Sequence, residues 1–177
     1  MSYDLSALKV LIKKIFPPKK SVYTIDTTGD NKADSIMIKA LNVIMPIEVP
    51  DEIEIGGFTT KDFDLNTFDL SEYGKIFLDD QRITVSKDDF EIDKLKERFI
   101  IYHNSEKFTI DDIIEGKLGG RLIALGDTVD VIIKLDKYAL EKFTEGEHKF
   151  RLESELIPVL EFIFELNKDN MNQNFVI

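Results

Sequence analysis

Three segments in the C-terminal half of the chain have apolar side chains at every second position. They are residues 129–135, 148–152 and 160–166, and His148 is the only polar residue in the apolar series. Successive side chains of a strand point to opposite faces, so each segment predicts a strand with one buried and one exposed face. Three such strands close together indicate an antiparallel sheet with one face in water.

Shorter apolar segments separated by turn residues predict further strands earlier in the chain. They are residues 22–25, 36–43, 75–78, 82–85 and 99–102, with 75–78 paired to 82–85 across residues 79–81. One helical turn is expected at residues 111–115, capped by Thr109 or Asp111. Because little helix lies between the strands, the pattern favours a mainly β fold, an antiparallel β-sandwich. We assign residues 21–166 to this sandwich, either as one domain or as two subdomains, 21–86 and 87–166.

Residues 4–15 have the spacing of a short amphipathic helix, which Pro17 and Pro18 end. Its apolar side consists of Leu5, Leu8, Leu11, Ile12, Ile15 and Phe16. Residues 1–20, this basic helix and a Pro-rich linker, carry five lysines and one aspartate, a side-chain charge of +4. The remaining chain therefore carries -15 of the total charge of -11.

A basic amphipathic helix can dock on another protein or on a membrane surface, or it can pack across its own domain. Three lysines in residues 4–15 make a weak membrane binder. We therefore favour packing on the domain and do not favour membrane contact.

Composition excludes several classes of function. A net charge of -11 and a pI near 4.7 oppose general nucleic-acid binding. The chain has no cysteine, so disulfides, thiolate metal sites and a cysteine nucleophile are excluded. The first residues lack the apolar run of a signal peptide, and no stretch of the sequence is apolar enough to span a membrane. We expect a cytoplasmic protein or one carried inside a virion.

The segment DTTGDNKAD, residues 26–34, carries oxygen-bearing side chains at alternate positions. It resembles the calcium loops of EF-hand and dockerin proteins, which direct every second residue at one cation. The resemblance implies calcium as a cofactor, with ligands from Asp26, Thr28, Asp30, Lys32 (through its carbonyl) and Asp34.

This loop departs from the calcium-loop pattern at two positions. The sixth residue is Asn31 in place of glycine, and the twelfth is Met37 in place of the bidentate glutamate. A calcium site without that glutamate binds weakly. A plain hairpin loop rich in Asp, Gly and Asn has the same composition.

Residues typical of catalytic centres are sparse. His103 and His148 belong to no metalloprotease or nucleophile motif, so we expect both to be strand-end residues. The glycines of GKLGG, residues 116–120, lack the spacing of a phosphate-binding loop. Acidic pairs at 79–80, 88–89 and 111–112 can supply an acid and a base for glycoside cleavage, but such pairs are expected by chance among 34 acidic residues.

Residues 127–166 resemble the closing strands of prokaryotic immunoglobulin-like domains. The resemblance rests on VIIKL at 131–135, GEHKF at 146–150, LEFIF at 160–164, and Tyr138, Leu140 and Phe143 between the first two. It implies an immunoglobulin-like β-sandwich preceded by the N-terminal helix. Pro158 departs from this pattern and indicates a bulge or an edge.

These observations favour a non-enzymatic protein-interaction or assembly subunit. Its helix and sheet edges would contact other protein chains or further copies of itself. The polar tail, residues 167–177, adds an apolar tip of Phe175, Val176 and Ile177 to the predicted contact residues. Two alternatives are a calcium-responsive binding module, which would use residues 26–34, and a carboxylate-dependent hydrolase.

Overall fold

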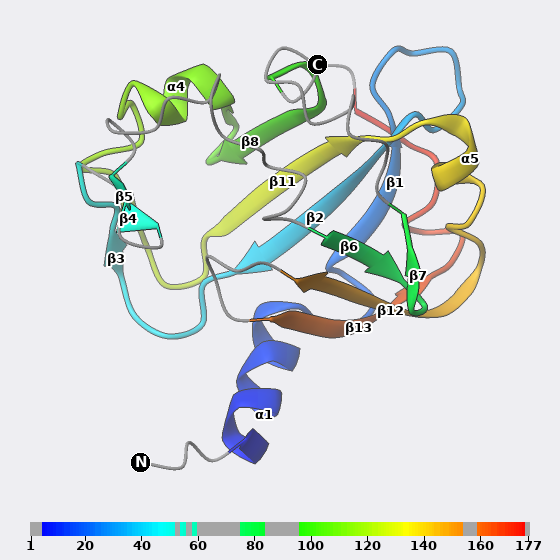
Figure 1. The fold of residues 1–177 in the computed structure, drawn as a ribbon, viewed down its shortest axis with the longest axis horizontal. Helices are drawn as coiled ribbons and strands as arrows, with labels where there is room; N and C mark the ends of the chain where they lie inside the picture. Colours follow the sequence, from blue (N-terminus) through cyan, green and yellow to red (C-terminus); the bar gives the residue numbers. More distant parts are fainter. Residues whose placement is uncertain are drawn as a thin grey trace.

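Two β-sheets form most of the described structure, the larger one lying above the smaller one in Figure 1. The computed structural model describes residues 5–51, 54–55, 58–59, 75–83, 96–153 and 159–175. In these residues the chain is mainly β, with mixed and antiparallel sheets. The predicted β class is therefore confirmed.

The larger sheet has six strands in the order β14-β1-β2-β11-β8-β9. These are β14 (Gln173–Asn174), β1 (Val22–Asp26), β2 (Ser35–Leu41), β11 (Thr128–Lys134), β8 (Phe99–His103) and β9 (Glu106–Thr109). All neighbours are antiparallel except β14, which pairs parallel with β1. The antiparallel pattern ends at this edge, because the chain returns from the smaller sheet and runs along β1 in the same direction.

The smaller sheet has four strands in the order β13-β12-β6-β7. These are β13 (Leu160–Leu166), β12 (Gly146–Glu153), β6 (Lys75–Leu78) and β7 (Gln81–Arg82). Two short pairs complete the described strands: β3 (Ile47–Glu48) with β10 (Leu122–Ile123), and β4 (Glu54–Ile55) with β5 (Phe58–Thr59). Each main sheet combines strands from both sides of residue 87, so that position does not separate one sheet from the other.

The main core lies between the two sheets. The larger sheet contributes Val22, Ile36, Ile38 and Ile133, and the smaller sheet contributes Ile76, Leu78, Phe150, Phe162, Phe164 and Leu166. In β13 the alternation holds as predicted, because Phe162 and Phe164 are buried while Ile163 between them is exposed. Burial of these aromatic rings supplies much of the driving force for packing.

The three alternating segments that we expected in one sheet with a wet face are divided between the sheets, since β11 lies in the larger sheet while β12 and β13 lie in the smaller one. The larger sheet is covered on both faces at its centre. Ile132 and Ile133 are adjacent in β11 and both are buried. Ile133 faces the main core, whereas Ile132 belongs to a second cluster with Ile25 and Met37. Phe175 packs against this second cluster, so the C-terminal segment covers the face that we expected to meet water.

The tight hairpin between β6 and β7 turns at residues with left-handed backbone conformation. Asp79 and Asp80 have φ of 50° and 63°, which gives a two-residue turn that matches the twist of the paired strands. The predicted three-residue connection across residues 79–81 is wrong, since Gln81 already pairs with Leu78. Residues 84–85 of the predicted partner strand lie outside the described residues.

Two short helices begin at capping side chains. Helix α4 (Ile110–Ile114) begins after Thr109, whose side chain accepts a hydrogen bond from the Asp112 amide while the Asp112 carboxylate accepts one from the Thr109 amide. This reciprocal arrangement satisfies two free amide groups and confirms the helical turn. Helix α5 (Lys137–Leu140) is capped by the Asp136 side chain, which accepts a hydrogen bond from the Ala139 amide.

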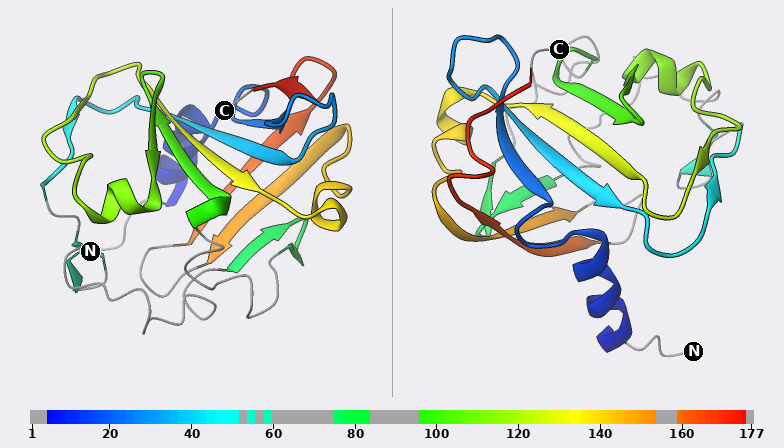
Figure 2. Two further views of the ribbon diagram at one scale, coloured as in Figure 1. Left: turned by 90° about the horizontal axis from the view of Figure 1, so that it is seen from above. Right: turned by 180° about the vertical axis from the view of Figure 1, so that it is seen from behind.

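Helix α1 (Leu5–Ile15) precedes the sheets and projects from their lower edge (Figures 1 and 2). Ile12 and Ile15 pack against the main core, and Phe16 just after the helix is buried in it. The Phe16 ring stacks on Phe162, with centroids 4.3 Å apart. The last turn of the helix is therefore anchored to the body of the protein. Among the described residues no helix is long and apolar enough to cross a membrane.

The anchoring role of Phe16 gives a stability prediction. Phe16→Ala removes a buried ring and is expected to lower the free energy of unfolding by about 3 to 5 kcal/mol. Val10→Ala, on the exposed side of the same helix, is the control and is expected to change it by less than about 0.5 kcal/mol. Urea unfolding followed by circular dichroism measures both, and equal effects would contradict the anchor.

Candidate functional site

Helix α1 holds most of the residues that sequence predicts to make contacts. Ile12, Ile15 and Phe16 pack on the core of their own chain, as the packing interpretation expects. Val10 is 57% exposed, and the first turns of the helix point away from both sheets (Figure 2). Leu11 is half-buried, and the side chains of Leu5 and Leu8 lie outside the described part of the structure.

The other predicted contact residue that the structure describes is Phe175. Its amide donates a hydrogen bond to the carbonyl of Asp26, and its ring meets Tyr102 edge to face at 5.4 Å. Phe175 therefore covers the outer face of its own sheet. Val176 and Ile177 lie beyond the described residues.

An exposed apolar patch that the sequence analysis missed lies where β3 and β10 pair. Its members are Ile44, Met45, Ile47, Leu122 and Leu125, which are 43% to 61% exposed. We call these five residues the β3–β10 patch. In the register of this pair Ile47 lies opposite Ile123 and Leu122 lies opposite Glu48, so Ile47 and Leu122 project from opposite faces. Exposed apolar side chains of this size are typical of interaction sites. Two apolar segments of the sequence, VIMPI at residues 43–47 and LIAL at residues 122–125, indicate these exposed residues. Neither segment alternates between apolar and polar residues.

An apolar groove of about 180 Å³ adjoins the β3–β10 patch. It lies between the base of α1 and the two apolar runs, and its walls include Ile15, Ala40, Ile44, Ile47, Ile123 and Val129. The groove therefore lies between the helix, the end of β2 and two residues of the patch, Ile44 and Ile47.

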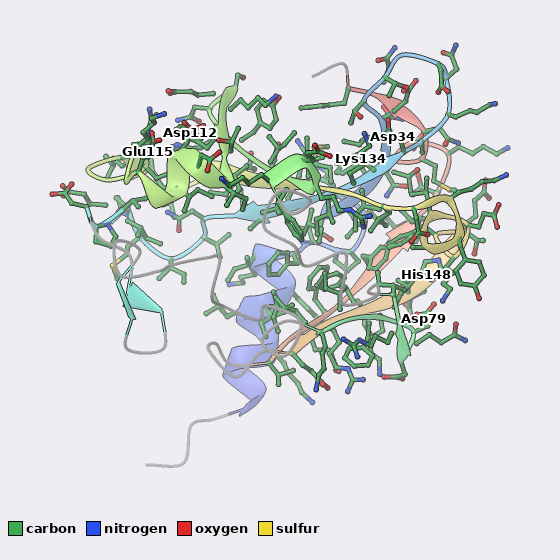
Figure 3. The ribbon with its side chains drawn as sticks, turned by 45° about the horizontal axis from the view of Figure 1, so that its top comes forward. Asp34, Asp79, Asp112, Glu115, Lys134 and His148 are labelled. Atoms are coloured by element: carbon green, nitrogen blue, oxygen red, sulfur yellow. The ribbon has the colours of Figure 1, made fainter. Side chains whose placement is uncertain are left out.

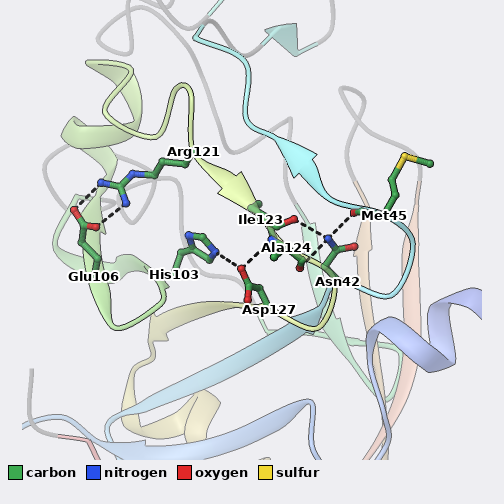
Figure 4. Close-up of polar contacts among 8 residues, drawn as sticks. All are labelled: Asn42, Met45, His103, Glu106, Arg121, Ile123, Ala124 and Asp127. Carbon is green, nitrogen blue, oxygen red and sulfur yellow. Dashed lines mark hydrogen bonds and ion pairs between the residues drawn. The ribbon is translucent and has the colours of Figure 1, made fainter.

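Hydrogen bonds to Asn42 and Asp127 hold the two loops of the patch together (Figure 4). The Asn42 amide Nδ2 donates to the carbonyls of Met45 at 2.7 Å and Ile123 at 2.9 Å. Asp127 accepts from the Ala124 amide at 2.9 Å and lies 3.3 Å from His103 Nε2. These contacts tie residues far apart in sequence, so the patch is presented on a fixed backbone.

Asp127 and His103 act as structural groups here. The hydrogen bond from the Ala124 amide, followed by that from His103, holds the pKa of Asp127 below its ordinary value. His103 is the last residue of β8, as predicted for a strand-end residue. Beside it, Arg121 forms two hydrogen bonds with Glu106 at 2.6 and 2.7 Å, which fasten the start of β10 to β9 (Figure 4).

The acidic loop, residues 26–34, uses its carboxylates to bind its own backbone. Asp26 is 1% exposed and accepts hydrogen bonds from the amides of Thr28, Gly29 and Asn31 at 3.0, 2.7 and 2.6 Å. Burial opposes the charge of Asp26, but these hydrogen bonds prevail and lower its pKa. Both carboxylate oxygens are thus engaged with N–H groups.

The other predicted calcium ligands have separate partners. Asp34 accepts hydrogen bonds from the hydroxyls of Thr27 and Ser35 at 2.8 and 2.6 Å. Asp30 is exposed and accepts from the Lys32 amide at 2.9 Å. Across the described ranges, no three acidic or histidine side chains form a group that could hold a metal ion. The loop geometry is accounted for by hydrogen bonds within the loop.

A second cavity, of about 540 Å³, lies between the acidic loop and α5. Its wall includes two carboxylates, Asp34 and Glu141, two lysines, Lys32 and Lys137, and apolar side chains such as Phe143. Asp34 is committed to Thr27 and Ser35 as described above. Of the predicted acidic pairs, 79–80 forms a turn and 111–112 lies in the first turn of α4, while 88–89 lies outside the described residues.

His148 is buried beside Asp79 in the smaller sheet (Figure 3). Its Nδ1 lies 2.7 Å from an Asp79 oxygen, and its Nε2 lies 2.8 Å from the carbonyl oxygen of Thr144. Each ring nitrogen therefore has an oxygen within hydrogen-bond distance. This histidine joins the β6–β7 turn to β12 and is structural in the described surroundings.

Asp26→Asn is expected to lower the melting temperature by several degrees, because it weakens charge-assisted hydrogen bonds that close the loop. The decrease should be the same with calcium and with a chelator. Asp30→Asn is the control, since it makes the same chemical change at an exposed position of the same loop. A calcium-dependent rise in melting temperature that Asp26→Asn abolishes would instead support the calcium site.

The stability that Asp79 contributes should depend on pH. Burial raises the pKa of Asp79, but the hydrogen bonds and charges of Lys149 and His148 outweigh burial and hold that pKa below 3.8. A lowered pKa contributes stability above the unfolded value, and the contribution is lost as the pH falls through the folded value. Asp79→Asn should therefore be less stable than the parent at neutral pH, and the difference should shrink in acid.

Asp169→Asn, at an exposed turn position, is the control for this pH experiment. Urea unfolding over a pH series measures the three proteins. A stability difference between Asp79→Asn and the parent that stayed constant down to low pH would contradict the linkage.

Two comparisons of the sequence with known proteins found no match. No protein-family model matches the chain, and no curated protein matches it. The basis for a function is therefore the geometry itself: a helix anchored at one end, with an apolar groove and an exposed apolar patch at its base.

Proposed function

We propose that this chain is a non-enzymatic protein-interaction or assembly subunit, which contacts other protein chains through α1 and the surface at its base. The observation that carries this proposal is the one-sided anchoring of α1. Its last turn is held by Phe16 and Phe162, while Val10 is 57% exposed on the part that projects from the body. Helices that project from a domain can dock on partner proteins.

The β3–β10 patch supports the same proposal. Its backbone is fixed by Asn42 and Asp127, so binding requires little ordering of the surface. Apolar side chains of this kind are typical of the buried core of protein interfaces. In this scheme the two sheets are an immunoglobulin-like sandwich that serves as the scaffold, a finer assignment that the shared core between the sheets supports.

The acidic loop and the larger cavity give weaker support to the other two functions. In the loop, Asp26 and Asp34 already accept hydrogen bonds from N–H and hydroxyl groups, and such donors do not favour a nearby cation. In the cavity, one of the two carboxylates belongs to Asp34, which already accepts hydrogen bonds from the hydroxyls of Thr27 and Ser35. The interaction proposal requires no rearrangement of either group.

A photo-reactive residue at position 10 tests the proposal in the cells that produce the protein. We expect it to crosslink the full chain to a discrete protein, either another protein or another copy. The same residue at Tyr138, which is 74% exposed on α5, is the control and should give no such product. Equal labelling at both positions, or no crosslink from position 10, would contradict the use of α1 as a docking element.

A further inference from the structure

The cavity between the acidic loop and α5 has the properties of a small-molecule site. It holds about 540 Å³, and sites for small ligands have volumes of this order, with mainly apolar walls and a few polar groups. Four segments lie side by side around it: β1, the acidic loop, α5 and the chain after β13 (Figures 1 and 2). We propose that this cavity binds a small carboxylic acid with an apolar body. None of its lining residues belongs to α1 or to the β3–β10 patch, so the inference goes beyond the proposed interaction function.

The apolar part of the wall explains the apolar body of the ligand. Leu135, Leu140 and Met171 line the cavity and pack against the main core, and Phe143 beside them is buried. Hydrocarbon placed against these side chains leaves water, which favours binding.

Two polar groups of the wall can donate hydrogen bonds that the described residues do not accept. Thr24 is 3% exposed, and its hydroxyl accepts a hydrogen bond from the Asn172 amide at 2.8 Å. The hydrogen of that hydroxyl has no acceptor among the described residues, and neither has the ammonium group of Lys32. A carboxylate accepts hydrogen bonds only and carries the charge opposite to that of lysine. It therefore suits both groups.

The charges of the wall allow an anion to enter. The chain carries -11, but the charged residues of this wall, Lys32, Lys137, Asp34 and Glu141, sum to zero. Asp34 already accepts hydrogen bonds from two hydroxyls, and Glu141 lies 3.8 Å from Lys137. In the described part of the chain, Lys32 is thus a cation of the wall without a carboxylate partner.

Backbone hydrogen bonds hold the walls in place. The Leu135 amide donates to the carbonyl of Asp34 at 3.1 Å, and the Asp34 amide donates to the carbonyl of Ile25 at 3.0 Å. The Thr24 amide donates to the carbonyl of Asn170 at 3.1 Å. These bonds join the acidic loop to the end of β11, and β1 to the chain after β13. A site that is already formed loses little freedom when a ligand binds.

Calorimetric titration of the purified full chain with octanoate tests the site, with octanol and octylamine as matched probes. The three probes share one alkyl chain, and the amine is a cation at neutral pH. The charge of -11 attracts the amine, so a preference for the acid must come from the local site. We expect octanoate to bind once per chain and more tightly than either other probe. Absence of octanoate binding, tighter binding of octylamine, or equal binding of acid and alcohol would overturn the proposal.

Three variants of the full chain test the roles of the wall. Lys32→Gln should raise the dissociation constant of octanoate about three- to fivefold and leave that of octanol unchanged. Lys107→Gln makes the same change at an exposed position of β9, at the far edge of the larger sheet, and should alter neither constant. Ala33→Phe places a ring at the cavity wall and should raise both constants at least about tenfold. Equal effects of the two lysine variants, or an Ala33→Phe variant that binds as the parent does, would contradict the site.

Methyl NMR of the natural sequence locates the probe without any substitution. Octanoate protons should show nuclear Overhauser contacts with the methyl groups of Leu140 and Met171 and none with Ile44 of the groove beside α1. Contacts with Ile44 alone would place octanoate in that groove and overturn the cavity as its site. This measurement decides the site even where Ala33→Phe rearranges the loop. Crosslinking from position 10 does not involve the cavity, so this inference can fail while the interaction function stands.

Discussion

Phe162 is the side chain on which the rest of the main core depends. Its ring stacks on Phe16 at 4.3 Å and lies 5.1 Å from Phe150 and 6.3 Å from Phe164. One ring therefore joins the N-terminal segment to two strands of the smaller sheet. Aromatic pairs of this kind combine a large buried area with preferred ring geometry. The direction in which α1 leaves the body follows from this contact, since the helix ends one residue before Phe16.

The same contact separates the anchored and projecting parts of α1. The last turn shares the stability of the core, whereas the backbone of the preceding turns leads away from the sheets (Figure 2). The backbone of the β3–β10 patch is held in place, because the Asn42 side chain donates hydrogen bonds to carbonyls of two loops. Because only its last turn is anchored in the core, the helix can change its direction without unfolding the core.

Much of the β structure could be predicted from the alternation of apolar and polar residues, because strands such as β13 bury only one face. In β13 that face carries Phe162 and Phe164. Alternation fails where a sheet is covered twice, as at Ile132 and Ile133. Strand β9 escaped prediction because Asn104 and Ser105 turn the chain without glycine. The helix was predicted from its spacing, but the β3–β10 patch was not, since it arises from two segments that only the fold brings together. Carboxylate spacing in the acidic loop could not distinguish metal ligands from groups that bind the loop backbone.

The closure of the larger sheet by the C-terminal segment has a consequence for how the protein forms. Strand β1 pairs with β14, and the Asn172 amide donates a hydrogen bond to the Thr24 hydroxyl 148 residues away in sequence. During synthesis, the outer edge of β1 stays open until residues near 175 have left the ribosome. Contacts of such long sequence separation form slowly, and an open strand edge can pair with other chains meanwhile. Strand β14 and Phe175 therefore act late in folding, as the piece that shields one of the first strands to be made.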